Sequence, residues 1–199
     1  MSKKLAILCS LGLLVAGCKK SKSSGPSAEV TGLAAVPASA EVVVVIDVPR
    51  VLDAPLVDHA IGVLLQRDPA LAERWEKLHT SCKLEPKTFQ HVVLAIGPHT
   101  GPQPGTGPVL VVATGKLVET ELAACVRAMV GQGGGTLTAS PLGNRTLYLA
   151  KDGNRTMYFA FGRPDTVLMA ANEASITEAL GAGKKITDNP DMVKWSALA

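Results

Sequence analysis

The chain is poor in aromatic residues and carries little net charge. Only seven of its 199 residues are Phe, Trp or Tyr, and 20 basic residues nearly balance 17 acidic ones. So few aromatics cannot form a base-stacking surface, and scattered basic residues create no positive field to attract phosphates. The sequence therefore predicts no nucleic-acid partner.

Common catalytic signatures are also missing. The chain contains no Gly-x-Ser-x-Gly, which excludes a nucleophile elbow, and no His-Glu-x-x-His, which excludes that zinc motif. Lys116 follows a glycine, but Leu117 stands where a phosphate loop needs Ser or Thr. Glu178 occupies the first-glycine position before Lys184 in the same way. We predict a non-enzymatic protein with no catalytic residues, no metal site and no cofactor.

Two alternatives stay open. In an envelope enzyme without a motif, acid or base work would fall to Asp47, Asp58, His59 and His99, if folding brought them together. Asp47 ends a valine-rich segment, where it is either partly buried with a raised pKa or a capping carboxylate beside Pro49. The second alternative is a ligand-binding module, with the Gly- and Pro-rich residues 97–107 as its lid.

No apolar run is long enough to cross a membrane. Residues 5–16 are twelve in number, whereas a membrane-spanning helix needs about 20, so the segment behind Lys3 and Lys4 indicates a cleaved signal peptide. It ends in Leu14-Val15-Ala16-Gly17-Cys18, which resembles the lipobox of bacterial lipoproteins. The resemblance implies cleavage between Gly17 and Cys18, a diacylglycerol on the Cys18 sulfur and a further acyl chain, such as palmitate, on its amine. The alternative is an ordinary secretory signal with Cys18 left as a plain thiol.

This interpretation divides the chain into three parts. Residues 1–17 are the lipoprotein signal peptide, 18–35 the lipidated cysteine and a flexible tether, and 36–199 a single domain. The lipid bilayer is then a partner through acylated Cys18, and an unknown envelope protein is a second. In many Gram-negative bacteria an aspartate after the lipidated cysteine retains the protein in the inner membrane. Lys19 is not that aspartate, which favours the outer membrane.

Cysteine counting predicts one disulfide. Of four cysteines, Cys9 leaves with the signal peptide and Cys18 receives lipid, so Cys82 and Cys125 remain in an exported, oxidising compartment. We expect these two to pair. The alternative is two buried thiols that pack as small apolar residues.

Periodicity predicts an α+β fold. Strands are expected at 41–47, 91–96 and 108–114, and helices at 53–66, 68–82 and 119–130. Gly143-Asn144-Arg145-Thr146 recurs as Gly153-Asn154-Arg155-Thr156, which indicates a four-strand antiparallel meander followed by two short helices. We predict an antiparallel or mixed sheet with helices on one face, starting as a ferredoxin-like split β-α-β unit. The valine run at 41–47 is expected to be buried on both faces.

The chain also resembles exported lipoproteins of the myxobacterial kind. The shared features are Val36-Pro37, Ile46-Asp47, Pro55-Leu56-Val57, Cys82, Gly115-Lys116-Leu117 and Cys125. Such proteins often continue into a second, similar half, which would make residues 36–199 the first half. The resemblance implies no activity. We expect a membrane-anchored, non-catalytic binding or scaffolding domain in the cell envelope.

Overall fold

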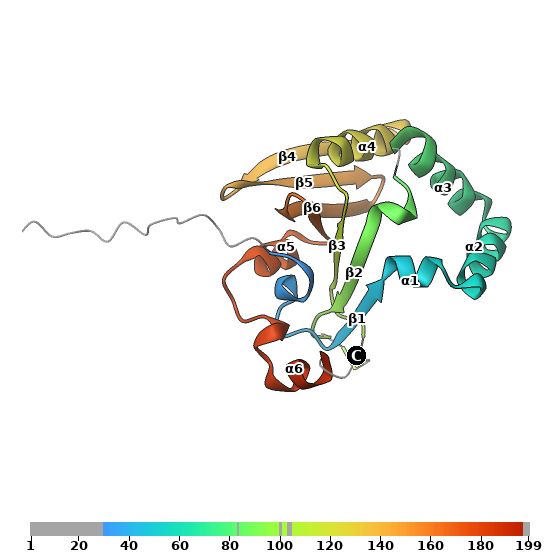
Figure 1. The fold of residues 1–199 in the computed structure, drawn as a ribbon. Coiled ribbons are helices and arrows are strands. Elements are labelled where there is room, and N and C mark those ends of the chain that lie inside the picture. Colours follow the sequence, from blue (N-terminus) through green and yellow to red (C-terminus); the bar gives the residue numbers. More distant parts are fainter. Residues whose placement is uncertain (1–29, 83, 100, 103–104, 197–199) are drawn as a thin grey trace, which may run out of the picture.

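The computed structural model describes residues 30–82, 84–99, 101–102 and 105–196. Its centre is a seven-stranded antiparallel sheet with the strand order β1-β2-β3-β7-β6-β5-β4 (Figure 1). The strands are β1 (Val42–Asp47), β2 (Phe89–Ile96), β3 (Val109–Gly115), β4 (Thr136–Leu142), β5 (Arg145–Asp152), β6 (Arg155–Arg163) and β7 (Thr166–Ala170). The α-helices are α1 (Val48–Leu52), α2 (Pro55–Arg67), α3 (Pro69–Cys82), α4 (Glu119–Gln132), α5 (Glu173–Leu180) and α6 (Pro190–Ser196). Three short 3-10 helices are η1 (Gly32–Ala35), η2 (Pro86–Thr88) and η3 (Ile186–Asp188).

The α+β class and the meander are confirmed. β4, β5, β6 and β7 pair in sequence order through antiparallel hairpins. Gly143 and Gly153 open the first two turns with φ of 63° and 59°, in the left-handed region that glycine adopts without strain. The repeated Gly-Asn pairs therefore act as turn signals, as their sequence predicts.

The start of the fold differs from the prediction. In a split β-α-β unit, the two strands joined by the helix are parallel and a third strand lies between them. Here β1 and β2 are direct neighbours and antiparallel, with Val44 opposite Leu94. The helices between these strands reverse the chain direction, so the ferredoxin-like start is wrong.

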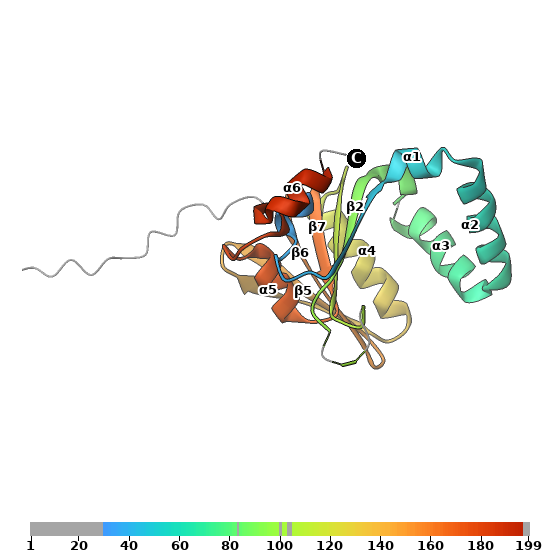
Figure 2. The ribbon, with the colours of Figure 1, turned by 90° about the horizontal axis from the view of Figure 1, so that it is seen from below.

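Helices cover both faces of the sheet (Figure 2), so the prediction of helices on one face is wrong. On one face, η1, α5 and η3 pack against the sheet and bury Val36, Ile176 and Leu168. On the other face, α4 packs Ala123 against Phe159 and Val167. Side chains of β3, β6 and β7 alternate between the two clusters, because successive residues of a strand point to opposite faces.

The N-terminal end of the described chain is held at the middle of the sheet. The Val30 amide donates to the Gly162 carbonyl over 3.3 Å. The Thr31 hydroxyl lies 2.9 Å from that of Thr166, which is completely buried and donates in turn to Asp165. Residues 30 and 31 thus join the domain at β6 and β7.

Residues 48–82, which form α1, α2 and α3, project from the sheet at the end of β1; we call them the arm. Figure 2 shows the arm on the opposite side of the molecule from α5 and α6. Neither α1 nor α2 contains a buried residue, and each α3 side chain that the structure describes is at least partly exposed. The arm therefore has no core of its own.

Candidate functional site

Gly17 and Cys18, the proposed cleavage and lipidation residues, lie outside the described residues. Lipidation therefore stays a prediction from the sequence. Among the helices that the structure describes, none is both long and apolar enough to span a membrane.

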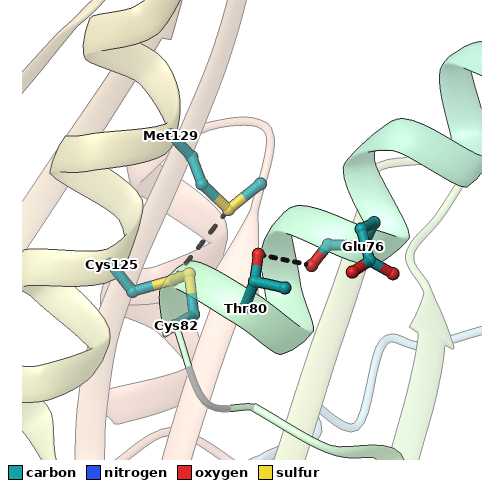
Figure 3. Close-up of a disulfide and its surroundings, with 5 residues drawn as sticks. All are labelled: Glu76, Thr80, Cys82, Cys125 and Met129. Carbon is teal, nitrogen blue, oxygen red and sulfur yellow. Dashed lines mark hydrogen bonds between the residues drawn. A yellow bond between two sulfur atoms is a disulfide. The ribbon is translucent and has the colours of Figure 1, made fainter.

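Cys82 and Cys125 form the predicted disulfide, with their Cα atoms 4.9 Å apart (Figure 3). Cys82 is the last residue of α3, and Cys125 lies in α4 with its side chain toward α3, 6% exposed. The bridge also lies beside Met129, whose sulfur is 3.9 Å from that of Cys125. It joins the end of the arm to a helix that belongs to the core.

Asp47 is a capping residue. Its carboxylate is exposed and accepts a hydrogen bond from the Arg50 amide over 3.1 Å, as an N-cap of α1. The expectation of a partly buried carboxylate is therefore wrong, and the capping interpretation holds.

The structure places the remaining acid-base candidates on different elements. Asp58 and His59 lie in α2, and His99 lies in the loop after β2 with Nδ1 2.7 Å from Glu41 Oε2. This interaction lowers the pKa of the Glu41 carboxyl, because a hydrogen bond from the ring favours its charged form. Within the described ranges, no three His, Cys, Asp or Glu residues form a group that could hold a metal.

Residues 97–107, the predicted lid, enclose little space in the part that the structure describes. Gly97, Pro98 and Pro108 border a cavity of about 40 Å³ between the loop and α5. Such a volume is comparable to the roughly 30 Å³ that one water molecule occupies in the liquid. It offers no room for an organic ligand.

The valine run is an edge strand, and it is not covered on both faces. Val42, Val44 and Val45 are 40%, 45% and 53% exposed, and β1 is an edge strand with a neighbour on one side only. The prediction of a strand buried on both faces is thus wrong. β1 instead exposes apolar surface.

Strand register continues this apolar surface onto β2 and β3, where Leu94, Ile96 and Val111 are partly exposed. Val44 of β1 lies opposite Leu94 of β2, which lies opposite Val111 of β3, so all three side chains point to the same face. Two positions further along each strand, the next row on this face consists of Val42, Ile96 and Val109. Of these, Val42 and Val109 are 40% and 45% exposed. We call these six residues the open face. It lies on the α4 side of the sheet, but α4 packs mainly over β4 and β5, and the cluster beneath it reaches β3 at Ala113 without including the six residues of the open face.

A cavity of about 270 Å³ lies between the arm and β2, on the same side of the sheet as the open face. Its wall is almost entirely apolar and includes Trp75 and Leu78 of α3 and Phe89 and Val92 of β2. Trp75 also stacks obliquely on His79, at a ring distance of 5.4 Å. The arm therefore stands over the sheet with apolar surfaces on both sides of the gap.

Two wider hollows lie beside the α3–α4 junction. One, of about 580 Å³, has Lys87, Lys116 and Glu121 on its wall, and the other, of about 480 Å³, has Arg74 and Asp152. The first wall is balanced in charge, with Glu85 beside Lys87, whereas the second is mainly basic, because Lys77 and Arg155 also line it.

Sequence reasoning missed the open face and the exposed arm, although α2 carries a signal. Its apolar residues cover more than half of the helix circumference, a wider face than packing on one neighbour requires; they are Leu56, Val57, Ile61, Val63, Leu64 and Leu65. Yet Leu56 is 78% exposed and Leu64 56%. Part of the apolar face of α2 is thus left exposed.

Known proteins give no further guide to the site. No family model matches the chain, and neither a search of curated proteins nor one of solved structures gives a match.

Proposed function

We propose that this chain is an exported lipoprotein that is held to an envelope membrane by acylated Cys18 and binds a partner protein without catalysis. The observation that carries the binding role is the open face, an apolar sheet surface left uncovered beside an arm that buries no residue in α1 or α2. Contiguous exposed apolar patches on soluble domains mark interaction sites.

The anchor is supported by the lipobox and by the chain that follows it. Eleven residues separate Cys18 from Val30, where the described domain begins. Fully extended, they would reach at most about 40 Å. Two or more acyl chains give stable membrane attachment, so the domain would work within this distance of the bilayer.

Energetics support a binding role of moderate strength. Complete burial of a Val or Leu side chain contributes about 1.5 to 3 kcal/mol, so each half-exposed residue has about 1 kcal/mol still to gain. Val42, Val44, Val109, Leu56 and Leu64 each expose 40% or more of their surface. Together they can contribute several kcal/mol to association, part of which offsets the entropy lost on binding.

A photo-crosslinking residue at Val44 of the full chain, expressed in cells, tests the binding role. We expect a protein adduct at Val44 that weakens when Leu64→Glu is added, with no adduct from the same probe at exposed Glu173 on α5. Absence of an adduct at Val44, or equal adducts at Val44 and Glu173, would refute a binding role for the open face.

A further inference from the structure

We infer that the partner is a second copy of this chain, and that two copies interlock so that the arm of each lies against the open face of the other. This inference rests on the proposed function, because it names the occupant of the same surface. Its starting point is that one chain exposes two apolar surfaces of different shape, one helical and one flat.

A dimer with twofold symmetry would cover both apolar surfaces at once. In such a dimer, surface i of one copy contacts surface j of the other, and j contacts i. The arm offers Leu56 and Leu64, and the open face offers Val42, Val44 and Val109. A single interface between two copies therefore covers both.

The size of the two surfaces matches the size of a stable dimer interface. Helices of 13 and 14 residues are about 20 Å long, and two side by side are about 20 Å wide, which gives about 400 Å². The two rows of the open face span about 14 Å along three strands spaced about 4.8 Å apart, which gives about 200 Å². Each copy would thus contribute about 600 Å², at the lower end of the roughly 600 to 1,000 Å² per partner of standard interfaces.

Charge does not oppose this association. The arm carries four basic and five acidic residues, and in α2 Asp58 is the sole Asp, Glu, Lys or Arg between Leu56 and Leu65. The open face carries no charge. Residues 30–199 as a whole contain 15 basic and 16 acidic side chains, so two copies would not repel each other.

The arm is also held ready to bind. α1 continues directly from β1, and the disulfide fixes the end of α3 to α4, so both ends of the arm are attached to the sheet. A pre-positioned surface loses less conformational entropy on association. The exposed leucines of α2 lie between these two attachment points.

The test uses two full-length copies with different epitope tags, co-expressed in cells, with the photo-crosslinking residue at Leu56. We expect an adduct that carries both tags and has twice the mass of the chain. Sedimentation of the purified full chain in density-matched detergent should show a dimer. Leu64→Glu should raise the dissociation constant of the dimer by at least about tenfold, because a charge would enter an apolar interface. Val118→Glu, at a valine 50% exposed outside the arm, is the matched control and should leave the dimer intact.

The outcomes separate the two proposals. A monomer by sedimentation together with a Leu56 adduct to a different protein would overturn the dimer and leave the binding role in place. A monomer without any adduct at Leu56 or Val44 would overturn both. Equal weakening by Leu64→Glu and Val118→Glu would also overturn the interface, whereas retained melting temperatures would show that the variants are folded.

Discussion

Cys82 and Cys125, whose Cα atoms are 4.9 Å apart, connect an arm without a core to a helix that belongs to the core. α1 also contacts β2 and η2, but α1 and α2 bury no residue, so no packed core holds the arm. The disulfide therefore sets how closely α3 stays beside α4.

Removing the disulfide should destabilise the arm first. For a closure of 43 residues the chain-entropy model gives a loss of about 4 kcal/mol in the free energy of unfolding. The double variant Cys82→Ala with Cys125→Ala should show this loss in denaturant unfolding, together with reduced helical circular dichroism. Non-reducing mass mapping of the exported protein should recover one linked peptide pair. Free thiols at both positions after denaturation without reductant would contradict the bridge.

The anchor can be tested directly. Cys18→Ser should abolish incorporation of radiolabelled palmitate and leave unprocessed precursor, because the sulfur that receives the lipid is gone. Cys9→Ser, within the predicted signal peptide, is the control and should retain labelling. Palmitate on the Cys18→Ser protein would show that the lipid is attached elsewhere.

Val44 and Val112 should respond differently to the same substitution. Val44 is 45% exposed on edge strand β1, and Val112 is 1% exposed in the middle of the sheet. Val44→Asp should cost about 1 to 2 kcal/mol and leave a folded protein that has lost its partner. Val112→Asp should cost about 3 to 5 kcal/mol, because it buries an unpaired charge. Equal losses in thermal melts would mean that β1 is covered.

The pKa of the Glu41 carboxyl should depend on His99. Its pKa is lowered from the usual 4.5, chiefly by the hydrogen bond from the ring. A lowered carboxyl pKa adds stability above the unfolded value, and this contribution disappears as pH falls below about 4.5 and through the folded pKa. His99→Ala should raise the Glu41 titration midpoint measured by NMR. An unchanged midpoint would show that the pair does not form in solution.

The histidines also test the absence of catalysis. His59→Ala with His99→Ala should leave complementation of a deletion phenotype intact, because surface substitutions usually change stability by no more than about 0.5 kcal/mol. Melting temperature and membrane location serve as controls. Lost function in a folded, correctly located double variant would indicate an enzyme instead of a binding domain.

Local signals predicted part of this molecule well. Gly143 and Gly153 fix tight turns through their own backbone conformation, and only one cysteine pair remained to be formed. The position of β1 could not be read in this way, because a run of valines has the same pattern at the centre of a sheet as at its edge. The open face depends on where α4 stops covering the sheet, which is a tertiary property.

The attachment of Thr31 to Thr166 determines how a pull from the membrane would reach the domain. If Cys18 is anchored, force along the tether acts first on residues 30 and 31, at β6 and β7. These strands have neighbours on both sides, whereas β1 and β4 form the sheet edges. Tension on the anchor would therefore act on several ladders of backbone hydrogen bonds at once, and would not peel away an edge strand one bond at a time.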